Sequence, residues 1–580
     1  MRGRQGSHSA RGKAAVFALG LAAALGLAAA GVAMAAGTAP PGGPGFGPPG
    51  AGGNLGRPGR PSLYTDPFAP SGPVAAPTES NSKGPPAGAH IPSVLDNATP
   101  PLVAAARDQQ QTLALSLIDQ GANVNATSPD GTSALMWAVH FDEVPLVERL
   151  IAAHANVRAV NTYGATPMYE AAIFADTAVI EKLVKAGANA DWANARGETA
   201  LMIVARTDNV AAAKFLIRHG ANVNAHETVL GQTALMWAAV RSEPQMVKLL
   251  LRYHADPNVR SYYNLDRRQI TAEPRIQARP TGGFTPLIYA ARQGCLACAK
   301  ALIAGGAKID MTDPDGETAL LIAVENFHFD LGAYLVKAGA NVNQWDWWGR
   351  TPLYAAVDLD TLPYGGRPDH VSLDSTTSLD MIRILLNAGA NPNAQLKLFP
   401  PYRSLGADRG GDMELTTGAT PLFRAARGAD IPAIQLLLAH GALVSLPNVN
   451  GDSPLMVAAG LTASKVDTRG RYRTEQEALA TVKALVAAGG NVNQTDGRGE
   501  TALFGAAALG WNDVVKCLAA DHADLNVRDD RGMTAIDAAE GRTAFFRRGT
   551  PDVHQDTVRL LRQLTIASSG PLSNPAQPVL

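Results

Sequence analysis

The chain has 580 residues, with 50 Lys and Arg against 51 Asp and Glu, and a formal charge of −1. This length exceeds that of a single core, so the architecture should be modular. The balanced charge argues against a generic binder of nucleic acid or acidic membranes, and an apolar content of 46% excludes wholesale disorder. Three cysteines, Cys295, Cys298 and Cys517, cannot supply a disulfide framework for so long a chain.

The first 36 residues have the pattern of an export segment. Basic residues precede an uncharged run over 14–36, and Ala33-Met34-Ala35 forms a small-x-small site near its end. This pattern is typical of a secretory signal peptide cleaved near Ala35. The alternative is an uncleaved membrane anchor, because a run of this length could span a bilayer. Both interpretations predict an exported protein of the periplasm or cell envelope.

Residues 37–92 are expected to form a linker. The stretch 37–90 holds 13 Gly and 13 Pro in 54 positions and only five charged residues. Such a segment cannot bury enough apolar surface to offset the entropy that ordering would cost. We therefore expect an extended spacer ahead of the folded part of the chain.

From residue 93 to about 565 the chain repeats one unit, and 566–580 are expected to form a disordered tail. A glycine followed two positions later by Thr or Ser and an apolar pair recurs eleven times, and its spacing is 33 residues six times and 34 once. A period in this range indicates a solenoid, whose units bury their apolar faces only against their neighbours. The eleven positions are Gly131, Gly164, Gly197, Gly231, Gly283, Gly316, Gly349, Gly418, Gly451, Gly499 and Gly532.

The unit over 164–196 shows why each repeat should contain two helices. Gly164 allows the positive φ of a tight turn, Thr166 can cap a first helix, and Pro167 suits its first position. Apolar residues then recur with the spacing of a second amphipathic helix. Gly187 supplies the left-handed residue that commonly ends such a helix.

These units resemble the ankyrin repeat family, as in TPLIYAARQG (285–294), TPLFRAARGAD (420–430) and AGANVNQ (338–344). The resemblance implies an all-α repeat solenoid of eleven to twelve helix-turn-helix and β-hairpin units. It also implies a noncatalytic protein–protein interaction scaffold. One departure is systematic: the histidine of the family's T-P-L-H pattern never occurs here, so packing should carry more of the stability.

Four insertions interrupt the period. Two lengthen hairpin tips by 19 residues each, at 260–282 and 395–417, and two separate the helices of one unit, at 358–378 and 460–475. Insertions in repeat arrays gather on one face, which is often the binding face. The two extended tips should therefore flank an interaction surface.

A tryptophan-rich tip, QWDWWGR (344–350), lies between the two extended tips, with Asp346 at the family's usual tip position. Exposed aromatic clusters are typical anchors of binding sites, which favours a protein partner at this rim. Two alternatives remain open: packing of the indoles beneath the neighbouring insertion, and stacking on sugar rings in an envelope glycan-binding module. The predicted partner-binding residues are Trp345, Trp347, Trp348, Tyr262, Tyr263, Phe399 and Tyr402.

Cys295 and Cys298 form the one redox-like motif, C-x-x-C. Core thiols or a disulfide are the favoured interpretation, with a redox-active protein as a weaker alternative. No H-E-x-x-H, catalytic triad or phosphate-binding loop stands outside the repeat pattern. The sequence therefore predicts no enzyme, cofactor, metal or nucleic acid, and it favours a monomer.

Overall fold

The computed structural model describes most of the repetitive region, namely residues 99–174, 176–270, 277–361, 372–398, 415–462, 473–542 and 552–568. The chain divides into two units, Met1–Ala89 and His90–Leu580. The predicted export segment and the whole of the predicted linker lie outside the described residues. In the part of the chain that is described, no helix has the length and apolar character needed to cross a membrane.

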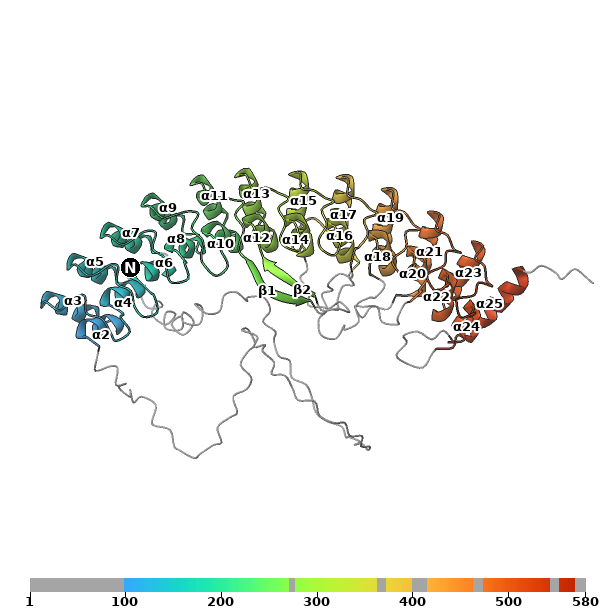
Figure 1. Ribbon diagram of the computed structural model, residues 1–580, viewed down its shortest axis with the longest axis horizontal. Coiled ribbons are helices and arrows are strands. Elements are labelled where there is room, and N and C mark those ends of the chain that lie inside the picture. Colours follow the sequence, from blue (N-terminus) through green and yellow to red (C-terminus); the bar gives the residue numbers. More distant parts are fainter. Residues whose placement is uncertain are drawn as a thin grey trace, which may run out of the picture. The chain divides into compact units, whose positions relative to one another are not determined.

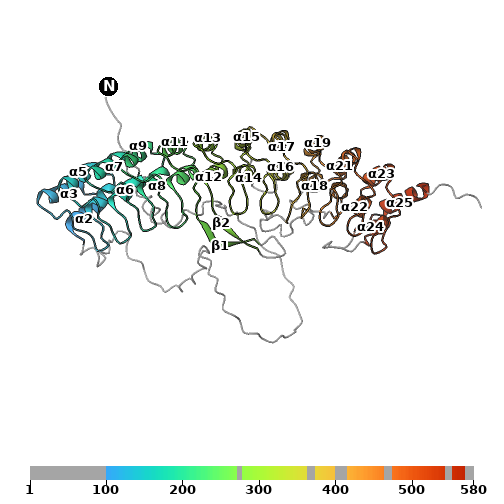
Figure 2. The ribbon, with the colours of Figure 1, turned by 45° about the horizontal axis from the view of Figure 1, so that its top comes forward.

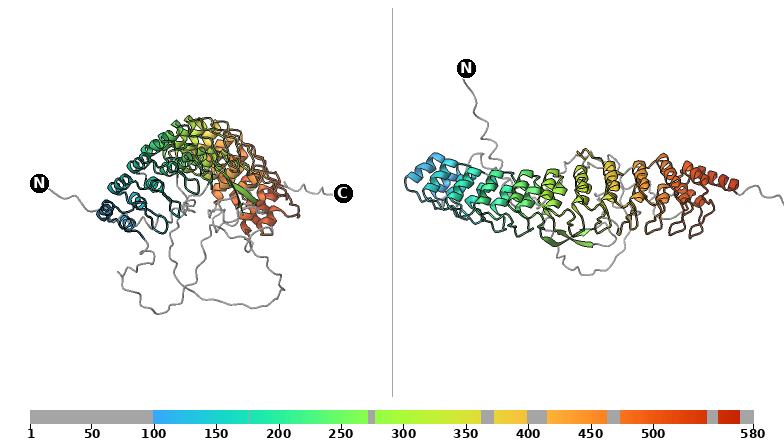
Figure 3. Two further views of the ribbon diagram at one scale, coloured as in Figure 1. Left: turned by 60° about the vertical axis from the view of Figure 1, so that its left-hand side comes forward. Right: turned by 90° about the horizontal axis from the view of Figure 1, so that it is seen from above.

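The second unit is a stack of helix pairs, which confirms the predicted all-α repeat solenoid. In each pair a first helix lies in one row and a second helix in another, and the first helices occupy the inner side of the curve (Figures 1 and 3). The first helices are α2 (Pro101–Arg107), α4 (Ala134–His140), α6 (Pro167–Phe174), α8 (Ala200–Ala205), α10 (Ala234–Val240), α12 (Pro286–Gln293), α14 (Ala319–Glu325), α16 (Pro352–Asp360), α18 (Pro421–Gly428), α20 (Pro454–Ala458), α22 (Ala502–Leu509) and α24 (Ala535–Ala539). The second helices are α3 (Gln111–Asp119), α5 (Val144–Ala152), α7 (Thr177–Lys185), α9 (Val210–Arg218), α11 (Pro244–Arg252), α13 (Leu296–Ala304), α15 (Phe329–Lys337), α17 (Ser378–Asn387), α19 (Ile431–Ala439), α21 (Glu475–Ala487), α23 (Asn512–Ala520) and α25 (Gln555–Ser568).

Local sequence chemistry starts and ends these helices as the repeat pattern predicts. The hydroxyl of Thr285 accepts the backbone N–H of Ile288 at 3.2 Å, and Pro286 occupies the first helical position. Gly187, after α7, has φ 98°. His254 takes the same place after α11 with φ 65°, although it is not glycine.

Asparagine side chains tie several neighbouring units together, including across the insertions. Oδ1 of Asn258 accepts the backbone N–H of Lys308 at 2.8 Å, 50 residues further along the chain. Asn343 accepts the N–H of Asn391 at 2.7 Å in the same way. The inserted segments therefore leave the stacking of neighbouring units uninterrupted.

The first extended tip forms an antiparallel hairpin. Strand β1 (Tyr263–Ile270) pairs with β2 (Gln277–Gly282), from Tyr263 opposite Gly282 to Ile270 opposite Gln277. The hairpin projects from the edge of the stack that carries the other hairpin tips, beside α12 (Figure 2). Extra residues at a tip thus lengthen an existing turn without displacing a helix.

The other three insertions fall largely outside the described residues, at 362–371, 399–414 and 463–472. Phe399 and Tyr402, two of the predicted partner-binding residues, lie in the second of these stretches. At the C-terminal end the structure corrects the predicted boundary, because α25 continues through Ser568. The helix outlasts its buried residues, the last of which is Leu561, and Ile566 is exposed.

Candidate interaction surface

The tryptophan-rich tip, 344–350, is a tight turn organised by one buried carboxylate. Oδ1 of Asp346 accepts the backbone N–H of Trp348 at 3.0 Å and that of Arg350 at 2.7 Å. Gly349 has φ 84°, in the left-handed region that side chains disfavour. These contacts fix the backbone from which the three indoles project.

The three indoles differ in exposure. Trp345 and Trp347 are 45% and 44% exposed, whereas Trp348 is 1% exposed. The second extended tip meets the backbone of Trp348, where the N–H groups of Lys397 and Leu398 both donate to its carbonyl oxygen, at 2.8 and 3.2 Å. The expectation that Trp348 contacts a partner is therefore wrong for this structure, and its indole belongs to the core of the array.

Cations from both extended tips stack on the two exposed indoles. The guanidinium carbon of Arg279, on β2, lies 3.8 Å from the ring centroid of Trp347, and Nζ of Lys397 lies 3.0 Å from that of Trp345. Arg279 is itself held by Asp315, with Nε 2.8 Å from Oδ1. We call Trp345, Trp347, Arg279 and Lys397 the tryptophan platform. Each exposed indole of the platform thus already has a cation stacked on it in the absence of a partner.

Tyr262 and Tyr263 extend this surface along the rim. Both are about half exposed. Each ring packs on a turn glycine, since a Cβ atom on Gly231 would lie 2.5 Å from the Tyr262 ring and one on Gly283 would lie 2.6 Å from the Tyr263 ring. The structure thus places four of the predicted residues, the two tyrosines with Trp345 and Trp347, on exposed hairpin tips.

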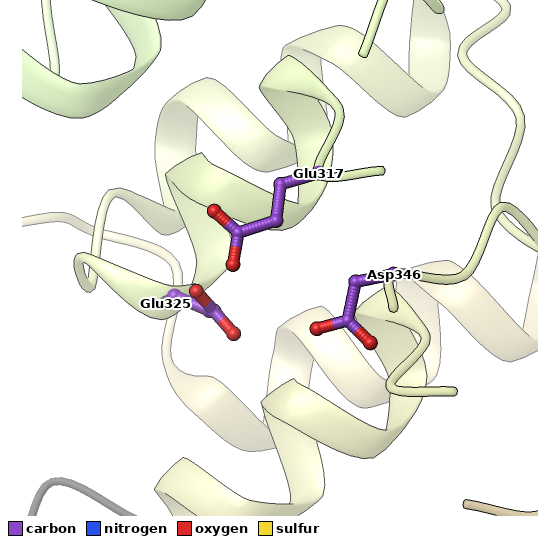
Figure 4. A group of neighbouring side chains, drawn as sticks. All are labelled: Glu317, Glu325 and Asp346. Atoms are coloured by element: carbon purple, nitrogen blue, oxygen red, sulfur yellow. The ribbon is translucent and has the colours of Figure 1, made fainter. Parts of the chain in front are cut away.

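Beneath the platform, Arg350 binds three carboxylates. Its guanidinium nitrogens lie 2.5 Å from Glu325, 2.6 Å from Asp346 and 3.0 Å from Glu317. Figure 4 shows the three carboxylates turned toward a common centre. Their oxygens lie within 4.8 Å of one another, as metal ligands do. Arg350 already supplies a cation to this group, so we assign it as an ion-pair node between neighbouring units.

The node holds more negative than positive charge in a poorly hydrated place. Burial raises the pKa of Asp346 to about 6, against the opposing attraction of Arg350. Burial, followed by repulsion from Glu325, raises the pKa of Glu317 well above its usual range. Burial lowers the pKa of Arg350, but its three carboxylate neighbours outweigh this and raise it above its ordinary value. Arg350 therefore stays charged at all working pH values.

The cysteine pair is oxidised. Cys295 and Cys298 form a disulfide at the start of α13, which settles the alternative of core thiols or a disulfide. Cys517 is a free, partly buried thiol near the end of α23. Burial, and then the charge of Asp521, raise the pKa of Cys517.

A second aromatic surface, on first helices near the N-terminal end of the stack, was not predicted. Trp137 and Phe141 stack with their centroids 5.8 Å apart, and His140 meets Phe174 edge-on at 5.1 Å. Nδ1 of His140 lies 3.0 Å from Oε2 of Glu170. We call Trp137, His140, Phe141 and Phe174 the first-helix aromatic surface. The sequence signal for this surface was the four-residue spacing of Trp137 and Phe141, which places both rings on one helix face. An alignment of the repeats does not reveal it.

Comparisons with known proteins agree with this architecture. A family model described as ankyrin repeats (3 copies) matches residues 102–191, 171–261, 287–396 and 473–563. The chain is 28% identical over 241 residues to the B-cell lymphoma 3 protein homolog of Mus musculus, with 41% of each chain covered. It is 26% identical over 273 residues to a putative palmitoyltransferase ZDHHC13 of Danio rerio, covering 47% of this chain and 35% of the relative.

Neurogenic locus notch homolog protein 1 of Homo sapiens is 28% identical over 214 residues, which cover 32% of this chain and 8% of that protein. The chain thus spans less than half the length of each of these curated relatives. The crystal structure of the ankyrin repeat domain of Bcl-3 matches at 24% identity and a TM-score of 0.33, covering 39% of this chain and 94% of that one. The family model covers more than half of the residues, and the chain therefore belongs to the ankyrin repeat family.

Proposed function

We propose that this protein is an exported, noncatalytic scaffold that binds a protein partner through the concave face and the hairpin rim of its repeat array. Ankyrin repeats are scaffolds for protein–protein interaction, and the specific surface is inferred from this chain. The observation that carries the proposal is the tryptophan platform, where Trp345 and Trp347 stay about half exposed on a rigid turn. The first-helix aromatic surface offers a second contact on the concave side.

The platform suits a partner because its side chains are already ordered. Exposed aromatic anchors contribute most to an interface when their orientation is fixed before binding, since less side-chain entropy is then lost. Arg279 and Lys397 fix one indole each, and Asp315 in turn fixes Arg279. Tyr262 and Tyr263 prolong the same rim.

Replacing Trp345 and Trp347 together by Ala should weaken partner binding by about 2 kcal/mol or more, roughly 30-fold in affinity. The midpoint of thermal unfolding should fall little, because neither indole is in the core. Tyr163→Ala is the matched control. Tyr163 is 80% exposed on a hairpin tip outside the platform, so the substitution also removes one exposed aromatic ring. Unchanged affinity for the double variant would move the binding site to the first-helix aromatic surface.

The partner for that affinity measurement is to be identified first, by crosslinking with a photo-reactive amino acid at position 345. The same group at Lys185, an exposed position at the end of α7, serves as the background. A protein crosslinked only from position 345 supports the scaffold. Retention of the chain on envelope polysaccharide, abolished by the double Ala variant, would instead support the glycan-binding alternative.

Export is the second part of the proposal, and the basic and then apolar N-terminal sequence supports it. We expect N-terminal sequencing of the protein from envelope fractions to begin near Ala36. An intact Met1 on a protein retained in the envelope would favour the membrane anchor. An intact Met1 on a protein in the cytoplasmic fraction would contradict export.

A further inference from the structure

The disulfide between Cys295 and Cys298 occupies the first turn of α13. Cys295 is the capping residue before the helix, and Cys298 is its third residue. The backbone N–H of Cys298 points at Sγ of Cys295, at 3.2 Å. This sulfur therefore already faces a hydrogen-bond donor that would stabilise it as a thiolate.

The two cysteine residues differ in exposure. Cys295 is 9% exposed, whereas Cys298 is fully buried, with 0% exposure. A thiolate must approach a disulfide sulfur directly in order to displace the other one. Only Cys295 can therefore accept an incoming thiol while the array stays folded.

The surroundings of Cys295 favour negative charge. The N-terminus of a helix carries partial positive charge and free N–H groups, which stabilise a thiolate placed there. An imidazole from the next unit also lies against the preceding residue, because a Cβ atom on Gly294 would be 2.4 Å from Nδ1 of His328. Cys517 has the opposite surroundings, near the C-terminal end of α23 and beside Asp521.

We propose that Cys295–Cys298 is an exchange-active disulfide, which a dithiol reductant opens by attack on Cys295. This activity is separate from partner binding at the rim. The sequence of the scaffold thus carries a thiol–disulfide site at the junction between α12 and α13, where a helix cap and a core residue are covalently joined.

The reaction balances with the dithiol as the only co-reactant. One thiolate of the dithiol bonds to Sγ of Cys295, and the bond to Cys298 breaks, so that Cys298 leaves as a thiolate and takes up a proton. The second thiolate of the dithiol then attacks the dithiol's first sulfur, which is bonded to Cys295 in the mixed disulfide, and releases Cys295 as a thiolate. Two electrons pass to the cysteine pair, and the dithiol becomes a disulfide.

The first test is native reduction of the full chain carrying Cys517→Ser. Dithiothreitol should open the disulfide without denaturant, and iodoacetamide should then trap the Cys295 thiol in the folded chain. The buried Cys298 thiol should be trapped only after later denaturation, and the helical circular dichroism of the reduced chain should be unchanged. Reduction that requires urea, or that removes helical signal, would overturn the proposal, because the disulfide would then be a purely structural link.

The second test compares single thiols with glutathione disulfide at neutral pH. The variant Cys298→Ser with Cys517→Ser leaves only Cys295, and Cys295→Ser with Cys298→Ser leaves only Cys517. Cys295 should react about tenfold faster or more, although Cys517 is the more exposed thiol. Equal rates, or faster reaction at Cys517, would refute the assignment. Cys298→Ala replaces Cys298→Ser if the buried hydroxyl unfolds the chain.

Discussion

Replacing Arg350 by Met should lower the free energy of local opening around α14 and α16 by about 3–5 kcal/mol near neutral pH. The substitution keeps most of the side-chain volume but removes the cation that Glu317, Glu325 and Asp346 share. One buried and two largely buried carboxylates would then face one another without a counter-charge. Native-state hydrogen exchange of amides in the two helices measures the loss, since an array of repeats opens locally.

The deficit of this variant should shrink as the pH falls. The folded-state pKa of Asp346 is about 6, above its ordinary value of 3.8, so the folded state binds this proton more readily than the unfolded state. The cost of burying the charged form is therefore present above pH 6 and is relieved as the pH falls through 6 toward 4. The attraction of Arg350 lowers the pKa of both Asp346 and Glu317. Without Arg350 the cost of burying the two charged carboxylates is larger, and protonation at lower pH relieves more of it.

Arg498→Met is the matched control. Arg498 also pairs with a cluster of carboxylates, with Nη2 2.8 Å from Asp496 and 3.2 Å from Glu500, but its side chain is 45% exposed. Solvent screening should limit its loss to about 1 kcal/mol or less. Equal losses for the two variants, or a deficit at Arg350 that does not change with pH, would mean that the node is not a buried, charge-dominated site.

The period of the sequence was sufficient to place the helices because each unit carries its own start and stop chemistry. Thr285 and Pro286 begin α12 through local contacts alone, and Gly187 ends its unit through its own backbone freedom. The spacing that leads from Gly164 to Gly187 also leads from Gly231 to His254, although this residue type gives no hint of a left-handed conformation. Such features need no information from distant parts of the chain.

The burial of Trp348 could not be predicted in this way. Tyr163 stands at the equivalent position, directly before a turn glycine, and is 80% exposed, whereas Trp348 is 1% exposed. Trp348 also differs in its backbone contacts, because Lys397 and Leu398 donate to its carbonyl oxygen from an insertion about 50 residues further on. Nothing in a periodic pattern specifies where an insertion folds back.

The ion-pair node was missed for a related reason. Its members Glu317 and Arg350 each follow a turn glycine, one unit apart, and Glu325 lies at the end of α14. Each residue alone is unremarkable for an exposed turn or helix end. They become a buried cluster only when consecutive units stack, which brings residues 33 positions apart together.

Replacing Trp348 by Ala should lower the free energy of local opening around α16 by about 3–5 kcal/mol. The indole is fully buried, so its removal loses apolar contacts and leaves a cavity in a well-packed interior. It also removes the ring above which Arg350 lies, with the guanidinium carbon 5.2 Å from the ring centroid. Hydrogen exchange of α16 amides and the midpoint of thermal unfolding both measure this effect.

Trp347→Ala provides the comparison, because it deletes the same side chain one residue away. Its indole is 44% exposed, and its stacked contact with Arg279 contributes about 0.5–1 kcal/mol. We therefore expect a much larger loss of stability for Trp348→Ala than for Trp347→Ala. For partner affinity we expect the larger loss at Trp347. Similar stability losses at both positions would show that the Trp348 indole is not buried in solution. Trp348 would then return to the set of candidate partner contacts, beside Trp345 and Trp347.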